Sequence, residues 1–308
     1  MYRFSGLYPY SPSELSNPLD FLAVNDHVLV CGSSGSGKSY LVKRLFPDPR
    51  GLVLFKPDAL FPDVPLASRI GLPLPELFKP YDVADSYLYA LQLDMSGIMA
   101  SSLVPVVMDA LFKGGGYGGF LDELDKIGND RVRGSIASIV KSHFSVLYPS
   151  WKKPRGRPSK ERKFLGSVIG GGRVSFAGLG SFKAEYGAEL FLRNLYSRLD
   201  ENFGVMVIDE FHHVAREGSI VDTLLREFRV SGQLVAITQS LSDVSPAMLS
   251  NFGHIFLGRS VHPGDLAYLA RLDSRLPVII AGLAPRVFLD LTQYLVDRNP
   301  LPLFGWVD

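Results

Sequence analysis

GSSGSGKS, residues 32–39, decides the fold of this chain. It fills every fixed position of the pattern G-x-x-x-x-G-K-[ST], in which a glycine-rich turn follows a strand and opens a helix. The apolar run HVLVC (27–31) precedes the turn, and LVKRLF (41–46) has helical spacing after it. Backbone N–H groups of such a turn point inward at phosphates, which the helix N-terminus also attracts. The stretch therefore predicts a P-loop.

Two side chains of this loop have predicted chemical roles. Lys38 is expected to reach the β and γ phosphates of ATP, and the Ser39 hydroxyl to supply a ligand to Mg²⁺. Cys31, which comes just before the loop, is expected to be a small core residue and not a nucleophile. The predicted ATP-binding residues are Gly32, Ser33, Ser34, Gly35, Ser36, Gly37, Lys38, Ser39 and Tyr40.

Further apolar runs, rich in β-branched and aromatic residues, predict strands that are buried on both faces. Two helical patterns, AELFLRNLYSRL (188–199) and IVDTLLREFRV (220–230), lie between them. Strands that alternate with helices predict an α/β fold with a mostly parallel central sheet flanked by helices. The predicted strands are GLVLF (51–55), RVSFAGL (173–179), VMVID (205–209), QLVAIT (233–238), HIFLG (254–258) and RVFLDL (286–291).

Residues 112–165 interrupt this pattern. They contain the glycine cluster GGGYGG (114–119), a predicted helix (130–147) and a basic, proline-containing segment. Their apolar content is too thin for a separate core, so we expect one domain over 1–308 with 112–165 as an inserted excursion. The glycine cluster is expected to be a flexible connector, or alternatively a mobile loop that touches a ligand.

The run VMVIDEFHH supports hydrolysis over a switch or a kinase. Asp209 stands at the end of a strand, where it is expected to enter the shell of Mg²⁺, and Glu210 is expected to polarise the attacking water. QLVAITQS ends in Gln239, which is predicted to sense the γ phosphate or position water, unless it only caps the next turn. His212 and His213 lack further ligands at metal spacing, so we expect them to be structural or to neighbour the site.

The composition bears on the partners and the cellular compartment of the chain. Thirty-two Lys and Arg residues oppose 31 Asp and Glu, so the net charge of +1 gives no global attraction to DNA or to acidic membranes. With 46% hydrophobic residues the chain has ample material for a core, and its single cysteine fits a reducing compartment. It shows no secretory signal and no apolar run of membrane-spanning length. We expect a cytoplasmic protein without membrane insertion.

The segment KKPRGRPSK (152–160) is the one strongly basic stretch that resembles a DNA-binding device. In RGRP the glycine allows a close approach to a groove floor, the arginines extend along it, and the proline keeps the backbone extended. This is the core of an AT-hook for the minor groove of A·T-rich DNA, and the alternative is a solvated basic loop. The predicted DNA-binding residues are Lys152, Lys153, Arg155, Gly156, Arg157 and Lys160, with added phosphate contacts from Arg162 and Lys163.

In their order along the chain, these motifs resemble the HerA/FtsK superfamily of DNA-pumping ATPases. The matching stretches are GSSGSGKS, VMVIDEFHHV, LLREFRVSGQLVAITQS, MLSNFGHIFLGRS and HPGDLAYLARL. The resemblance covers most of 25–295 and implies a RecA-like P-loop NTPase that uses ATP and Mg²⁺ to move double-stranded DNA. It also implies a hexameric ring in which a neighbour's arginine completes each site. Arg226 and Arg229 are the candidates, with Arg259 third, and their alternative role is a solvated helix face.

The sequence departs from the family pattern at two places. Phe228 and Val230 replace the usual glycine and lysine, which bears on how this segment meets a neighbouring subunit. The N-terminal barrel of the HerA proteins is missing, so we expect a minimal motor of viral or plasmid origin for genome packaging or DNA transfer. A packaging motor would be associated with the virion instead of being purely cytoplasmic. The alternatives are a secretion or conjugation-type ATPase that acts on protein, and a nucleotide-gated DNA-binding protein without catalysis.

Overall fold

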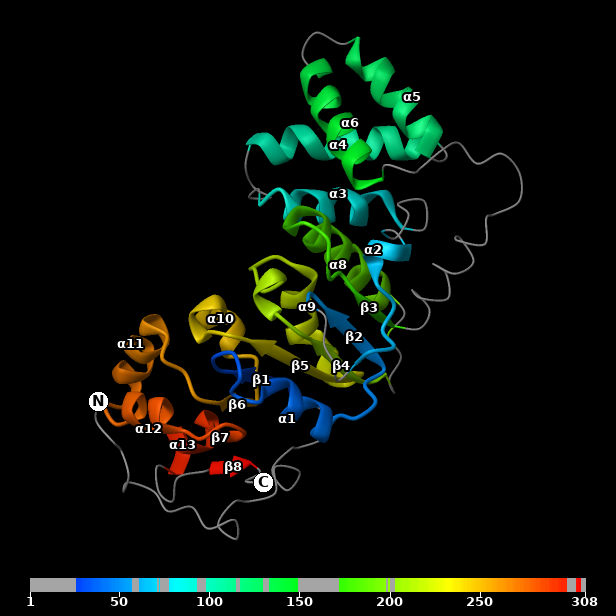
Figure 1. Cartoon of the computed structure of the whole chain (residues 1–308). Coiled ribbons are helices and arrows are strands. Elements are labelled where there is room, and N and C mark those ends of the chain that lie inside the picture. The colour runs from blue at the N-terminus through cyan, green and yellow to red at the C-terminus, as the bar shows by residue number, and fades with distance from the viewer. Residues whose placement is uncertain are drawn as a thin grey trace. The chain divides into compact units, whose positions relative to one another are not determined.

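A computed structural model of the chain divides into two compact units, where one domain was expected (Figure 1). The first unit comprises Met1–Leu54, Asp58–Pro62 and Leu199–Asp308, and the second comprises Phe55–Pro57 and Asp63–Arg198. The structure describes residues 26–56, 61–70, 72, 78–92, 98–114, 117–129, 133–148, 172–197, 199, 203–297 and 303–305.

Each apolar run that predicted a strand contains one. A further strand, β8, was not predicted, because its three residues lie in a short proline-flanked stretch with no alternation. The strands are β1 (Val28–Cys31), β2 (Gly51–Leu54), β3 (Arg173–Ser175), β4 (Gly204–Ile208), β5 (Gly232–Thr238), β6 (His254–Leu257), β7 (Val287–Asp290) and β8 (Leu303–Gly305).

The sheet of the first unit is mostly parallel, as predicted. Its strands follow the order β2-β4-β5-β1-β6-β7-β8, and the first five of these run parallel. Only β7 runs the other way: it pairs antiparallel with β6 and with β8 at one edge of the sheet. Every residue of β1 and of β5 is buried, which is what a central strand covered on both faces requires.

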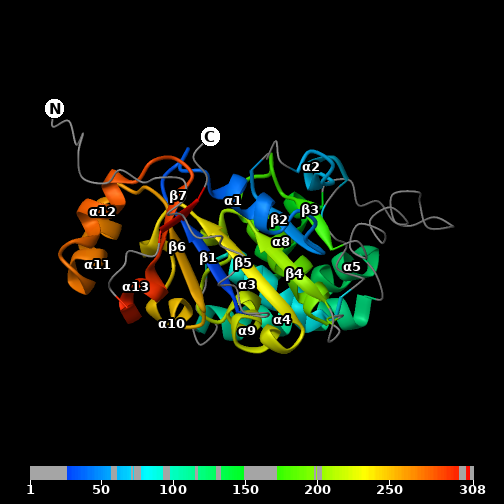
Figure 2. The same cartoon turned by 90° about the horizontal axis from the view of Figure 1, so that it is seen from below.

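Helices of the first unit connect these strands. The helices α11, α12 and α13 lie toward the β6–β7–β8 end of the sheet in both views (Figure 2). The α-helices are α1 (Lys38–Leu45), α9 (Ile220–Glu227), α10 (Pro246–Leu249), α11 (Pro263–Leu272), α12 (Leu276–Gly282) and α13 (Leu291–Asp297), and the 3₁₀ turns are η4 (Phe211–His213), η5 (Phe228–Val230) and η6 (Leu241–Asp243).

The second unit is mainly helical and has a core of its own. Phe144 packs with its ring centroid 4.8 Å from that of Phe120 and 5.3 Å from that of Tyr87. Around them Val106, Val107, Ala110, Leu124, Ala137 and Val140 are buried. The helices are α2 (Ala67–Ile70), α3 (Pro80–Ala90), α4 (Ile98–Gly114), α5 (Tyr117–Gly128), α6 (Gly134–Leu147) and α8 (Ser181–Tyr196).

Helices within 112–165 take part in this core, although the region was expected to be too poor in apolar residues for a core of its own. The region does not pack alone, because α3 and α4 supply Tyr87 and the Val106–Val107 pair from outside the predicted range. Most of GGGYGG also belongs to helices and not to a connector, since Gly114 ends α4 and Gly119 lies in the first turn of α5. A Cβ on Gly119 would lie 1.8 Å from the Gly114 carbonyl oxygen, so this close crossing requires glycine.

Helix α8 begins seven residues before its predicted start at 188. The first part of α8 was not predicted because it contains polar residues, which break the apolar spacing of a helix. One of them, Glu185, is nevertheless buried and accepts a hydrogen bond from the Ser181 hydroxyl at 2.7 Å. Gly187 lets α8 approach Phe176 so closely that a Cβ there would lie 2.7 Å from the ring. Among the described helices of the chain, none is long and apolar enough to cross a membrane.

Candidate active site

Three predicted motifs meet at one edge of the first unit's sheet. β1 ends at Cys31, which is level with Thr238 at the end of β5. In β4, Ile208 is level with Ala236, so Glu210, two residues later, comes level with Thr238. Because neighbouring strands are about 4.8 Å apart, β1 and β4 lie about 10 Å apart with β5 between them. Parallel pairing therefore brings the P-loop, the acidic pair and the Thr-Gln pair together.

The backbone of the P-loop has the predicted strand–turn–helix form. Gly32, Gly35 and Gly37 have positive φ angles of 155°, 79° and 98°. At Gly37 glycine is needed twice, because a Cβ would also lie 3.1 Å from the Cα of Arg286. The loop is supported from outside: the Ser33 N–H donates to the Arg259 carbonyl at 2.8 Å, and the Arg286 N–H donates to that of Ser36 at 2.8 Å.

The ammonium of Lys38 is held over the same loop. Its Nζ donates to the carbonyl of Gly32 at 2.6 Å and to that of Ser33 at 3.1 Å. Cys31, the last residue of β1 before the loop, is buried, and burial raises the pKa of its thiol well above the ordinary value. A thiol that stays protonated is a poor nucleophile, in agreement with the expected core role.

The acidic pair follows β4 as predicted. The Asp209 N–H donates to the Val53 carbonyl at 2.9 Å, which continues the β2–β4 pairing to the edge. Glu210 then turns into the left-handed region, with φ 50° and ψ 52°. Both residues are 8% exposed. A non-glycine residue in this conformation is strained, and such strain gathers at functional sites.

Gln239 contacts Glu210 directly. Its Nε2 donates to Oε1 at 3.0 Å and to Oε2 at 3.1 Å of the Glu210 carboxylate. Neither carboxylate oxygen can turn away without losing a hydrogen bond, so the amide fixes the orientation of this carboxylate. The sequence predicted both residues but not their contact.

His212 lies beside the same carboxylate, with Nδ1 3.5 Å from Glu210 Oε2. Its ring and that of His213 are 4.3 Å apart, centroid to centroid. No cluster of three or more metal-ligating side chains occurs among the residues with a described placement. Mg²⁺ takes oxygen ligands and is usually bound through one or two protein groups plus phosphates. The Ser39 hydroxyl and the Asp209 carboxylate are such oxygen donors.

The predicted arginines lie at the other end of the sheet. Arg226 Nη2 pairs with Asp222, and Arg229 Nη2 donates to the Asn251 carbonyl at 2.6 Å. Both precede β5, whose length separates them from the P-loop of their own chain by about 20 Å. Arg259 is different, since its carbonyl contacts the P-loop directly. All six predicted DNA-binding residues in 152–160 lie outside the described residues.

Two residues near the site were not predicted. Arg286 has a positive φ of 66° and its guanidinium lies over the Tyr40 ring, 4.6 Å from the centroid. Asp265 is a buried carboxylate that binds the segments after β5 and β6. A signal for Asp265 existed in HPGDL, where proline and an acidic residue mark the first turn of a helix.

No protein-family model matches the chain, and no curated protein matches it. Among solved structures, the bacterial conjugative coupling protein TrwBdeltaN70, in its unbound form, is similar over 92% of this chain and 85% of that one, with a TM-score of 0.60 and 15% identity. Plasmid coupling protein TrwB in complex with the ATP analogue ADPNP gives a TM-score of 0.55 at 13% identity, over 92% and 85% of the two chains.

The DNA-packaging ATPase B204 from Sulfolobus turreted icosahedral virus covers 93% of this chain and 100% of its own, at 13% identity and a TM-score of 0.42. That value is too low to carry an argument. The likeness to TrwB shows the fold: the chain has the predicted RecA-like P-loop NTPase architecture.

Proposed function

We propose that this chain is an ATP-hydrolysing motor of the HerA/FtsK type that moves double-stranded DNA. One observation carries the proposal: the Glu210 carboxylate, fixed by Gln239, stands at the same sheet edge as the P-loop. A protein that only binds nucleotide needs no group for the attacking water, whereas a hydrolase needs a base held near the phosphates.

The loop residues bind the triphosphate in this proposal. Inward N–H groups of the turn and the N-terminus of α1 attract the phosphates, and the Lys38 ammonium neutralises charge on the β and γ groups. Tyr40 follows in the first turn of α1 and would complete the nucleotide-binding residues. Ser39 and Asp209 would hold Mg²⁺, which neutralises phosphate charge when it is bound.

Glu210 acts as the base that takes a proton from the attacking water. Its carboxylate is kept in one orientation by the Gln239 amide, so little reorganisation precedes the proton transfer. Because Gln239 lies at the end of β5, a shift of that strand end would move the carboxylate. Hydrolysis and the position of β5 are then mechanically linked.

Duplex DNA and a ring of identical subunits complete the proposal. Arg226 and Arg229 lie too far from their own P-loop to act there, which supports action on a neighbour's nucleotide in a hexamer. The conjugative role of TrwB supports DNA as the partner, and the segment 152–160 supplies basic residues for it. A cytoplasmic location is part of the proposal, in keeping with the single cysteine.

ATP hydrolysis measured with and without duplex DNA tests this function against its alternatives. The motor predicts turnover that DNA stimulates strongly, by about tenfold or more in kcat. Turnover that ignores DNA would favour an ATPase that acts on a protein substrate. Nucleotide-dependent DNA binding without turnover would favour a gated binding protein.

A further inference from the structure

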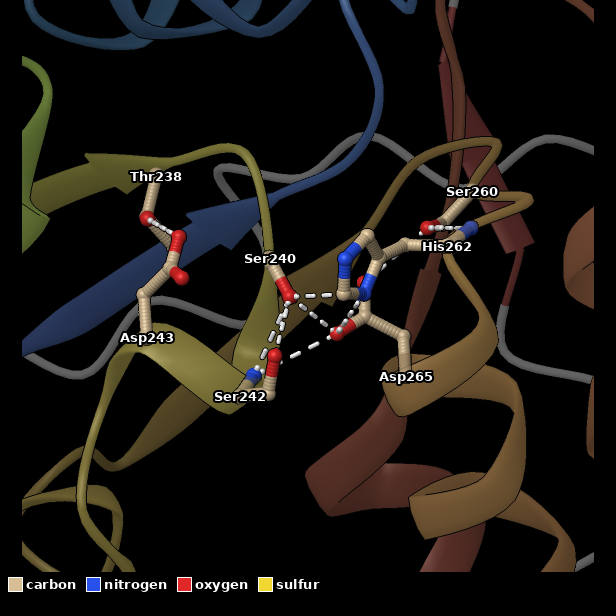
Figure 3. Close-up of polar contacts among 7 residues, drawn as sticks. All are labelled: Thr238, Ser240, Ser242, Asp243, Ser260, His262 and Asp265. Carbon is tan, nitrogen blue, oxygen red and sulfur yellow. Dashed lines mark hydrogen bonds and ion pairs between the residues drawn. The ribbon is translucent and has the colours of Figure 1, made fainter.

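A buried carboxylate to which the sequence analysis gave no role organises the edge of the sheet beside the P-loop (Figure 3). Asp265 lies in the first turn of α11 and is 1% exposed. Its Oδ1 accepts hydrogen bonds from the Ser240 hydroxyl at 2.5 Å and the Ser242 N–H at 3.3 Å, and its Oδ2 accepts one from the Ser260 hydroxyl at 3.0 Å. The N-terminus of α11 stabilises this negative charge.

One arm of Asp265 reaches the segment that carries Gln239. Ser240 comes directly after Gln239, and its hydroxyl also accepts a hydrogen bond from the Ser242 N–H, which caps η6. The bond from Ser240 to Asp265 therefore fixes where β5 ends. Because the Gln239 amide grips both oxygens of Glu210, the position of this strand end sets the position of that carboxylate.

The other arm reaches the support of the P-loop. Ser260 follows Arg259, whose carbonyl accepts the Ser33 N–H at 2.8 Å, and the Gly258 N–H donates to the Cys31 carbonyl at 2.8 Å. The segment after β6 is thus bonded to the loop on one side and to Asp265 on the other. A single carboxylate joins the phosphate-binding backbone to the strand end that holds the base.

The cluster is not a hydrolytic triad of its own. In such a triad a histidine stands between the serine and the acid. Here the Ser240 hydroxyl bonds Asp265 directly, and His262 lies to one side with Nδ1 3.4 Å from Ser240 and 3.9 Å from Asp265. The geometry suits a structural link between the segment after β5 and the segment after β6.

We propose that Asp265 is a positioning residue of the ATPase site, which sets the distance between the P-loop and the Glu210 carboxylate through Ser260, Ser240 and Gln239. This inference rests on the proposed hydrolysis of ATP. Charge-assisted hydrogen bonds are stronger than neutral ones. A carboxylate with three donors therefore holds the two segments in place more firmly than a neutral side chain would.

The test compares Asp265→Ala and Asp265→Asn with the control Asp290→Ala. Asp290 is 2% exposed in the same unit and also caps a helix, accepting bonds from the N–H groups of Thr292 and Gln293, but it bonds nothing in the candidate site. We expect Asp265→Ala to lower kcat about 30-fold with little change in the KM for ATP. Asp265→Asn keeps an acceptor for Ser240 and should restore part of kcat. Asp290→Ala should keep kcat within about twofold despite a comparable loss of thermal stability.

A double-mutant cycle with Gln239→Ala separates positioning from general damage. If Asp265 acts through Gln239, adding Asp265→Ala to Gln239→Ala should lower kcat by no more than about twofold further. Multiplied losses, or an equal loss of kcat in Asp290→Ala, would overturn the inference and leave the proposed function standing. A wild-type chain without ATP turnover would overturn both. Should Asp265→Ala not fold, Ser240→Ala removes the first bond together with the cap of η6, leaves the Ser260 bond in place and carries the same cycle.

Discussion

Glu210 has a strained backbone that its neighbours maintain. Its φ of 50° and ψ of 52° cost about 1–3 kcal/mol for a residue of this kind. The two hydrogen bonds from Gln239 and burial of the side chain fix the conformation. The proposed role of Glu210 as the base requires such a carboxylate, held in one orientation by its neighbours.

Two substitutions should separate nucleotide binding from turnover. Lys38→Ala removes the charge that meets the β and γ phosphates, so ATP affinity should fall by at least about tenfold. Glu210→Gln keeps the shape and the binding but cannot take a proton, so kcat should fall about 100-fold or more. Titration with a fluorescent ATP analogue and steady-state hydrolysis measure the two effects. Equal losses of affinity in both variants would contradict the role given to Glu210.

His27 gives the first unit a pH-dependent stability. The ring is fully buried, and the Leu234 N–H donates to its Nδ1 at 3.1 Å. Burial, reinforced by the nearby Arg229, lowers its pKa from 6.5 to about 4. The folded chain therefore holds this histidine neutral at a pH where the unfolded chain protonates it. The contribution is fully present above pH 6.5 and is lost as the pH falls toward 4.

Between pH 7 and pH 5, His27 should reduce the free energy of unfolding by about 2 kcal/mol. His27→Asn retains an acceptor for the Leu234 N–H but cannot be protonated. Urea unfolding at both pH values should show a smaller pH dependence in this variant by about that amount, even if its stability at pH 7 is lower. An unchanged pH dependence would show that His27 does not control it.

The sequence predicted which residues belong to the candidate site, but it did not predict which of them contact one another. Lys38, Asp209, Glu210 and Gln239 each stand in a motif with fixed spacing, which the chain alone displays. The bond between Glu210 and Gln239 depends on β4 lying next to β5, and the role of Asp265 depends on α11 reaching back to the end of β5. Such contacts follow from strand order, which local patterns do not encode.

At the scale of elements, α9 and η5 carry the predicted arginines away from the site of their own chain. The Ser219 hydroxyl caps α9 by accepting the Asp222 N–H at 3.3 Å, and the two arginines follow near its end. Phe228, where the family pattern has glycine, is buried and packs its ring 5.5 Å from that of Phe203. Val230, where the family pattern has lysine, is 77% exposed.

Mixed rings should show whether either arginine acts on a neighbour. Lys38→Ala subunits have a damaged loop but intact arginines, and Arg229→Ala or Arg226→Ala subunits have the reverse. If the arginine works in trans, mixtures should hydrolyse ATP faster than either variant alone, because some interfaces pair an intact loop with an intact arginine. The exposed Arg271→Ala on α11 serves as the control that should keep full activity alone. Absence of rescue at every mixing ratio would count against both arginines.

Amphipathic elements were the most predictable ones. The apolar spacing of α9 is clear, and it was predicted at its observed start. Helix α3 was missed because its buried side includes Asp85 and Ser86, and Asp85 pairs with Arg193 of α8 at 3.2 Å. Polar residues that are satisfied by a distant partner look like a surface in the sequence, so periodicity fails there.

For the molecule as a whole, a net charge of +1 concentrates any DNA affinity in local segments. If RGRP binds the minor groove, replacing Arg155 and Arg157 with alanine should weaken binding to A·T-rich duplex more than to G·C-rich duplex. Replacing Lys152 and Lys153 should weaken both alike and flatten the salt dependence. Binding titrations on both duplexes at two salt concentrations measure this. An equal loss for both duplexes in the arginine variant would reduce the segment to a basic tether.

Movement along DNA is the central claim, and displacement of a third strand from a triplex measures it most directly. A labelled oligonucleotide bound in the major groove is released only when a motor travels along the duplex beneath it. With ATP the wild-type chain should displace the strand, while Glu210→Gln should bind the duplex and release at least about 100-fold more slowly. DNA-stimulated ATP hydrolysis without displacement by the wild-type chain would contradict the account.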